Sequence, residues 1–168
     1  MDRLIYGLGF VVLVGCAAVI IASSAGMPPM VASHFDASGR GGSFMARADY
    51  ELLMLGVAVG LPLFLAFVLA IAPSMAPGML NVPNARAWLS GPHQAEARRT
   101  LAVRGALMAI FLACFITVVH LLVVAANRVV PPRLDGTHFA TALAAFMLGM
   151  AWWTVSLMLY FRRGPPSR

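Results

Sequence analysis

The sequence predicts an all-α integral membrane protein, a four-helix bundle that forms a single membrane domain over residues 1–168. Composition and segment length carry this prediction. Hydrophobic residues make up 61% of the chain and charged residues only 11%, with a mean hydropathy of +0.85, whereas a soluble globular chain has about 25% charged residues. Four apolar segments are also long enough to cross a hydrocarbon core, which takes about 20 helical residues.

The four predicted helices cover residues 4–23, 52–71, 101–126 and 139–161. They are expected to be helices because a spanning backbone must satisfy its own hydrogen bonds, and the sequence shows no alternating barrel pattern. Pro62 is expected to kink the second helix. Two pairs of small residues, Gly56 with Gly60 and Ala145 with Gly149, are expected to let helices of the bundle pack closely.

The placement of the arginines predicts that both termini face the cytoplasm. All twelve basic residues are Arg; eight lie on the side of the termini and four on the other, and basic residues favour the cytoplasmic side. The connection between the first two helices, residues 27–47, is therefore expected to face outward from a bacterial inner membrane. The net charge of +6 fits this topology and anionic headgroups, so we expect membrane lipids and no nucleic acid as partners.

The first helix contains two possible processing signals. "LVGC" at 13–16 resembles a lipoprotein cleavage site, and "ASSAG" at 22–26 resembles a signal-peptidase site. The apolar stretch that follows Cys16 argues against cleavage there, so we expect a retained helix. Cys16 and Cys114 both lie in apolar runs and are predicted to be small buried residues, with no disulfide and no metal between them.

Residues 27–47 predict an ordered outer loop. The stretch opens with a proline pair and turns through "GRGG", where glycines permit positive φ. Phe35 is expected to dock on the bundle while His34 faces a partner or the headgroups. We take His34, Phe35, Asp36 and Gly39 as candidate partner-binding residues.

The same loop raises the question of a metal site. His34, Asp36 and His138 lie on one side of the membrane, and two His with a carboxylate would suit zinc or copper. They come from separate loops without a close cluster, so we predict no metal and no cofactor. The chain also has no G-x-S-x-G, H-E-x-x-H or phosphate-binding glycine motif, and we predict no catalytic residues and no enzyme.

The connection at residues 81–99 predicts a second contact region. Trp88 is expected to anchor at headgroup level, and Asn84 follows a proline that restricts the backbone. We list both as candidate partner contacts, beside the simpler interpretation of a loop that lies on the membrane.

His120 is the one clear ionisable group placed inside a predicted helix. A single His makes no proton relay, which argues against a transporter, and we expect it to hydrogen-bond a neighbouring helix. We assign His120 and Asn127 to polar contacts within the helices.

Three stretches resemble the SdpI-type membrane family, and together they span nearly the whole chain. "MPPMVASHFDASGRGGSF" resembles its defining element, and "NVPNARAWL" and "HLLVVAAN" are similar to stretches of its short four-helix members. The matching positions are Pro28, Val31, His34, Phe35, Gly39, Phe44, Arg47, Asn81, Pro83, Asn84, Trp88, Leu89, His120 and Asn127.

The resemblance implies immunity to a membrane-active peptide toxin, or signalling by sequestration of a repressor at the membrane. It favours a protein that recognises a peptide or envelope partner at residues 27–47. The residues leave open a second class, a small accessory subunit that stabilises a larger membrane complex.

Overall fold

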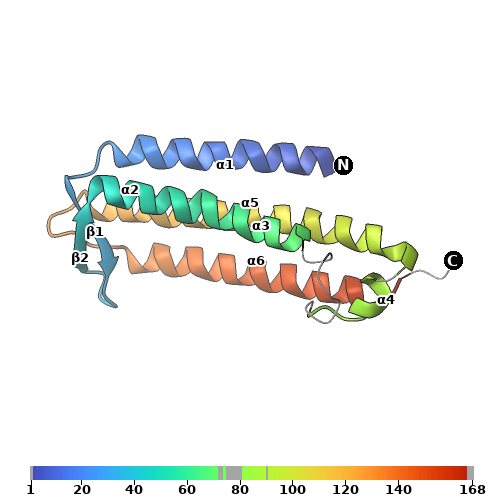
Figure 1. Ribbon diagram of the computed structural model, residues 1–168. Helices are drawn as coiled ribbons and strands as arrows, with labels where there is room; N and C mark the ends of the chain where they lie inside the picture. Colours follow the sequence, from blue (N-terminus) through green and yellow to red (C-terminus); the bar gives the residue numbers. More distant parts are fainter. Residues whose placement is uncertain (1, 72–73, 75–80, 90, 166–168) are drawn as a thin grey trace.

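The computed structural model describes residues 2–71, 74, 81–89 and 91–165. Four long helical segments lie side by side, and the beginning of α1 and the end of α6 lie at the same end of the molecule (Figure 1). All four are long and apolar enough to cross a membrane. They are α1 (Asp2–Ser24), the segment Arg47–Ile71 formed by α2, η1 and α3, α5 (Gln94–Ala126) and α6 (Gly136–Arg162).

The all-α prediction is wrong at the end of the bundle opposite the termini. There β1 (Met30–Phe35) and β2 (Gly41–Ala46) form a two-stranded antiparallel hairpin between α1 and α2, with Met30 opposite Ala46 and Phe35 opposite Gly41. Strand pairing satisfies backbone N–H and C=O groups that an irregular loop would leave to water. We call this the hairpin end and the opposite end the terminal end.

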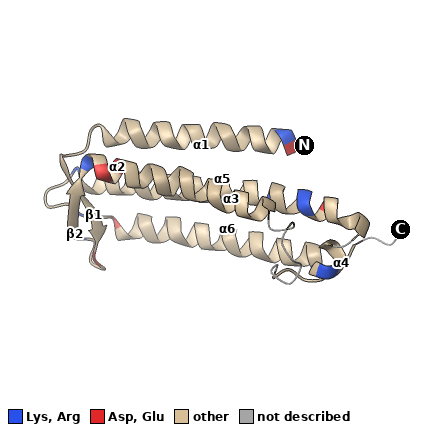
Figure 2. Ribbon diagram, viewed as in Figure 1, with Lys and Arg blue, Asp and Glu red and all other residues tan. Residues whose placement is uncertain are grey.

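All four helices begin earlier than hydropathy predicts, and two of them do so by more than one turn. The second segment starts at Arg47 rather than residue 52, and α5 starts at Gln94 rather than residue 101. The added turns are polar but rich in residues with good helix propensity, and hydropathy does not detect such turns. Figure 2 shows the charged residues gathered at the two ends of the helices, with an uncharged zone between them.

Pro62 is accommodated by a wide turn. The chain runs from α2 (Arg47–Leu55) through a π-helical turn, η1 (Gly56–Gly60), into α3 (Leu61–Ile71). The N–H of Leu61 bonds the carbonyl of Gly56, five residues back. Because proline has no N–H and its ring crowds the carbonyl four residues earlier, a π turn relieves the clash within the helix.

The two pairs of small residues differ in whether a neighbouring helix packs closely against them. A Cβ on Gly56 or Gly60 would meet nothing within 4 Å, so the prediction of close packing at that pair is wrong. A Cβ on Gly149 would lie 2.3 Å from Cζ of Phe111, so this glycine does admit a ring from α5. Gly105, which the sequence did not single out, has Cβ of Leu69 at 3.0 Å.

Helix α5 is the centre of the bundle and contacts α1, α3 and α6. Of these spanning helices, α6 packs chiefly against α5. Cys16 is buried as expected, whereas Cys114 on α5 is an exposed residue, so the prediction that it is buried is wrong. The buried residues form clusters along α5, from Trp88, Leu89, Leu101, Leu157 and Phe161 at the terminal end to Met27, Val31, Tyr50, Val123 and Val124 at the hairpin end.

Candidate functional site

The tip of the hairpin is built on the Asp36 carboxylate. Its Oδ1 accepts hydrogen bonds from the Ser38 amide at 2.8 Å, the Ser38 hydroxyl at 2.7 Å and the Arg40 amide at 3.0 Å. Gly39 adopts φ +80°, a backbone conformation that favours glycine. The bond from the Ser38 hydroxyl, followed by those from the amides, lowers the pKa of Asp36 below its ordinary value. Asp36 therefore fixes the turn.

The tip is held against the connection between α5 and α6. The amide of Leu134 donates to the carbonyl of Gly39 at 2.8 Å, and the amide of Gly41 donates to the carbonyl of Pro132 at 3.1 Å. A Cβ on Gly39 would lie 2.5 Å from the Leu134 oxygen. Only glycine fits this approach.

The base of the hairpin is clamped by Asn127, which follows the last residue of α5. Its Oδ1 accepts from the Ala32 amide at 2.8 Å, and its Nδ2 donates to the Ala32 carbonyl at 3.0 Å and to the Val123 carbonyl at 2.9 Å. All three bonds are buried, and Ala32 has no exposed surface. The amide side chain thus takes the place of a further strand beside β1.

His120 joins three helices just below the hairpin. Its Nε2 lies 2.8 Å from the Ser23 hydroxyl on α1, and its Nδ1 lies 3.0 Å from the Tyr50 hydroxyl on α2. The Ser23 hydroxyl donates to the Val19 carbonyl at 2.6 Å. Every group is satisfied when Nε2–H donates to Ser23 and Tyr50 donates to Nδ1. The arrangement is a structural hydrogen-bond chain between helices.

Arg47 closes the entry to α2. Its Nη1 donates to the carbonyls of Ala25 and Met27 at 3.0 and 3.1 Å, and its own amide donates to the Pro29 carbonyl at 2.9 Å. These carbonyls belong to the chain just after the end of α1, where a cation is favoured. The start of α2 is thereby tied to the end of α1.

Two pockets lie beside the hairpin, with volumes of about 410 and 520 Å³. The larger one lies between the hairpin, α5 and the start of α6, and Phe35, Val119 and Phe139 are among its apolar walls. His34 is exposed at its edge, and its Nδ1 lies 3.3 Å from the Ser33 hydroxyl. We call this larger pocket the hairpin pocket. A further pocket, of about 590 Å³, lies at the terminal end of the bundle.

The second strand leaves an open edge. Apart from the Gly41 amide, which donates to the Pro132 carbonyl, β2 pairs with β1 alone among the described residues, and the Phe44 side chain on it is 51% exposed. An exposed strand edge presents unpaired backbone N–H and C=O groups that an extended peptide can join. The hairpin therefore offers both a pocket and a strand edge.

Asn84 and Trp88 do not belong to this site. At the terminal end, Nδ2 of Asn84 donates to the carbonyls of Phe161 and Arg162 at 3.2 and 3.1 Å, and Nε1 of Trp88 donates to the Phe161 carbonyl at 3.0 Å. Trp88 is 3% exposed and stacks on Tyr160, so the expectation of a headgroup anchor is wrong. Both side chains cap the last turn of α6, whose carbonyls have no partner within the helix.

The possible metal ligands are engaged separately. Nδ1 of His138 lies 2.8 Å from the Asp135 carboxylate, which also accepts from the amides of Thr137 and His138 as the N-cap of α6. The bond from the His138 amide, followed by the one from its side chain, lowers the pKa of Asp135. Within the part of the chain that the structure describes, no group of three His, Cys, Asp or Glu side chains is placed to hold a metal ion.

Sequence reasoning identified His120 and Asn127 but missed their partners. Ser23 and Tyr50 are polar residues at the ends of apolar helices that meet at the hairpin end. Because antiparallel neighbours bring these ends to the level of His120, matching polar residues by depth would have found them. Ala32 bonds through its backbone, which gives no signal in the sequence.

Comparison with models of known protein families, with curated proteins and with solved structures finds no match for this chain.

Proposed function

We propose that this chain is a bacterial inner-membrane protein that recognises a peptide or protein partner of the cell envelope with its hairpin. The observation that carries the proposal is a rigidly held hairpin with exposed recognition groups. Its tip, base and entry are fixed by the bonds of Asp36, Asn127 and Arg47, while His34 and Phe44 remain exposed. Preorganised elements bind at a lower entropic cost than flexible loops.

The chemistry of the hairpin suits an extended peptide with an apolar side chain. The open edge of β2 supplies backbone donors and acceptors, and apolar walls of the hairpin pocket supply a place for a side chain. Main-chain pairing then gives affinity, and the pocket gives selectivity. We infer that a membrane-active peptide toxin, the ligand that the SdpI resemblance implies, would bind in this way.

Several residues that carry the SdpI resemblance have structural roles in or beside the hairpin, and this supports the resemblance. Val31 is fully buried, Phe35 lines the hairpin pocket, Gly39 makes the strained turn, and Arg47 ties α2 to α1. These side chains build the hairpin, and His34 is the exposed member of the same element. With termini in the cytoplasm, the hairpin faces outward.

Photo-crosslinking in living cells tests the proposal. A photoreactive amino acid is placed at Phe44 or His34, and the matched control places it at Trp152, which is 75% exposed on α6. We expect a discrete peptide or protein adduct from the two hairpin positions and none of the same mass from Trp152. The absence of any hairpin-specific adduct during toxin or envelope stress would refute recognition by the hairpin.

The second candidate is an accessory subunit of a larger membrane complex, and the position of α6 favours it. Only 6% of the apolar stretch of α6 is buried, against 39% for that of the segment that contains α5. Leu148 and Trp152 on α6 are 73% and 75% exposed. A mild-detergent pull-down with mass spectrometry separates the candidates. Stoichiometric larger subunits would establish the accessory role, whereas recovery alone, with a soluble regulator or with a peptide would support recognition.

A further inference from the structure

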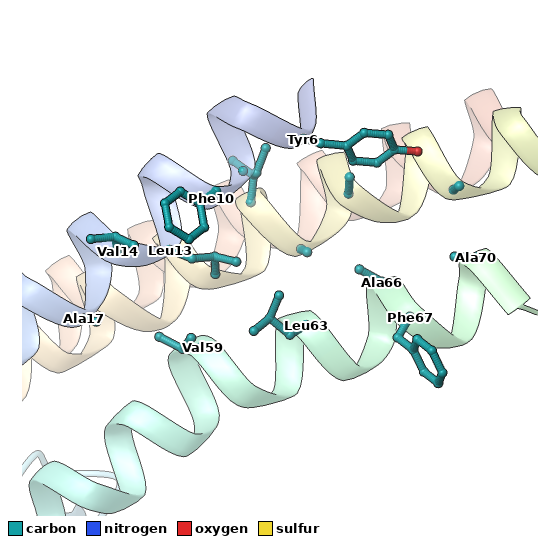
Figure 3. A pocket seen from close by; sticks show the side chains of 15 residues that line it. Tyr6, Phe10, Leu13, Val14, Ala17, Val59, Leu63, Ala66, Phe67 and Ala70 are labelled. Carbon is teal, nitrogen blue, oxygen red and sulfur yellow. The ribbon is translucent and has the colours of Figure 1, made fainter. Parts of the chain in front are cut away.

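A groove opens at the terminal end between α1 and α3. It has a volume of about 590 Å³, and α5 forms its floor with Ala102, Ala106 and Ala109. Figure 3 shows α1 and α3 separating toward this end, with apolar side chains of both helices beside the space between them. Among the described residues that line it, Tyr6 alone has a polar side chain. We call this space the α1–α3 groove.

The start of α1 is held at α5 by an ion pair. The Asp2 carboxylate accepts from Nε and Nη2 of Arg99. The ion pair therefore fixes the mouth of the groove at the terminal end, where Figure 2 shows opposite charges at the beginning of α1. The α5 residues that line the groove include small alanines, which leave its space open.

Positive charge lies at this mouth on both helices. Arg3 precedes Tyr6 by three residues on α1, and Arg99 precedes Ala102 by three residues on α5, so each Arg shares a helix face with groove-lining residues. Although Arg99 pairs with Asp2, its side chain remains 66% exposed. The two Arg and one Asp leave a net positive charge beside an apolar groove.

We propose that the α1–α3 groove binds an anionic phospholipid of the surrounding membrane, with an acyl chain along the groove and the phosphate at Arg3 and Arg99. Charge complementarity selects this occupant, because guanidinium groups bind phosphate through several N–H donors. Basic pockets between spanning helices bind anionic headgroups in this way. The volume lies within the range of about 300 to 1,000 Å³ of small-ligand sites. An apolar helix from another protein would leave the arginines unmatched.

Native mass spectrometry of the intact protein tests the charge. The protein is purified in mild detergent and equilibrated with equal amounts of phosphatidylglycerol and phosphatidylcholine. We expect one phosphatidylglycerol molecule to be retained in preference. Arg3→Gln is expected to weaken that retention about fivefold, the effect of one basic side chain near a headgroup. Arg128→Gln, which removes an exposed Arg at the hairpin end, should leave it unchanged.

A second pair of variants tests the groove. Ala106→Phe fills the floor and should abolish retention, whereas Ala151→Phe makes the same change at an exposed position of α6 and should not. Equal retention of both lipids by the wild type would overturn the proposal, as would wild-type retention by Ala106→Phe. A dimer that only Ala106→Phe disrupts would assign the groove to a second copy instead. If Ala106→Phe does not fold, the Arg3→Gln result decides.

Discussion

Replacing Asn127 by Leu should release the hairpin from the bundle while leaving the four helices in place. Leu has nearly the same volume, so the change removes hydrogen bonds without opening a large cavity. The lost bonds are those to the amide and carbonyl of Ala32 and to the carbonyl of Val123. The helices keep their own contacts along α5.

The size of this effect follows from the backbone groups of Ala32 that the substitution leaves without a hydrogen-bond partner. Ala32 is fully buried, and leaving a buried donor or acceptor without a partner costs about 1 to 3 kcal/mol for each group. The two Ala32 groups together therefore contribute about 2 to 6 kcal/mol. Opening the hairpin to water relieves this cost, so the closed state should lose at least about 2 kcal/mol relative to the open one. That corresponds to about a 30-fold rise in the open population.

Hydrogen–deuterium exchange measures the opening at amides that the substitution does not touch. The amides of Gly41 and Leu134 join the hairpin tip to the connection between α5 and α6, and they should exchange about 30-fold faster in the Asn127→Leu protein. Asn84→Leu, which alters a cap at the terminal end, is the matched control and should leave them unchanged. Unaltered exchange at both amides in Asn127→Leu would refute the clamp.

Three further changes test the same end of the protein. His120→Leu removes the bonds to Ser23 and Tyr50 and should lower the free energy of unfolding in a bilayer by about 1 to 3 kcal/mol, at about 0.6 to 1.7 for each interhelical bond. Gly39→Ala puts a Cβ on a residue at φ +80° and should destabilise the hairpin by more than about 1 kcal/mol, seen as faster exchange. Acidification should loosen the hairpin turn: since the folded pKa of Asp36 is depressed, its stabilisation is present above the unfolded value of about 3.9 and is lost as pH falls through the lower folded value. The amide NMR resonance of Ser38 should follow that titration.

Each of these has a matched control. Tyr50→Phe removes one of the two His120 bonds and should cost about half as much as His120→Leu; no loss in Tyr50→Phe beside a full loss in His120→Leu would show that packing, and not the hydrogen bonds, decides. Gly42→Ala is the control for Gly39→Ala, because a Cβ there meets nothing within 4 Å; equal effects would contradict the steric argument. Asp36→Asn should remove the titration of the Ser38 resonance, and its persistence would assign the titration to another group.

The sequence predicted the spanning helices well because membrane insertion depends on a quantity that single segments carry. Length and hydropathy located all four segments, since each must satisfy its backbone within itself. The same argument failed at the polar turns before residues 52 and 101, where the helices extend beyond the apolar segments. Both the success and the failure follow from each segment's own sequence, without reference to the helices that pack against it.

The sequence also singled out residues of the hairpin, but it did not predict their roles. Asp36 and Gly39 were expected to meet a partner, and the structure shows that both build the turn. Asn84 and Trp88 were placed beside them as contacts, yet they cap α6 at the opposite end. Residue type therefore singled out these positions, but it did not show which contacts each side chain makes.

The sequence by itself determined four helices that are long and apolar enough to span a membrane, because the hydrophobic effect acts on each apolar segment alone. Only the tertiary structure decided that residues 30–46 form a hairpin held against α5. Asn127 bonds Ala32 across 95 positions of the chain, and His120 bonds Ser23 across 97. Such bonds form only after the helices have packed, because the folded backbone brings these groups within reach of one another.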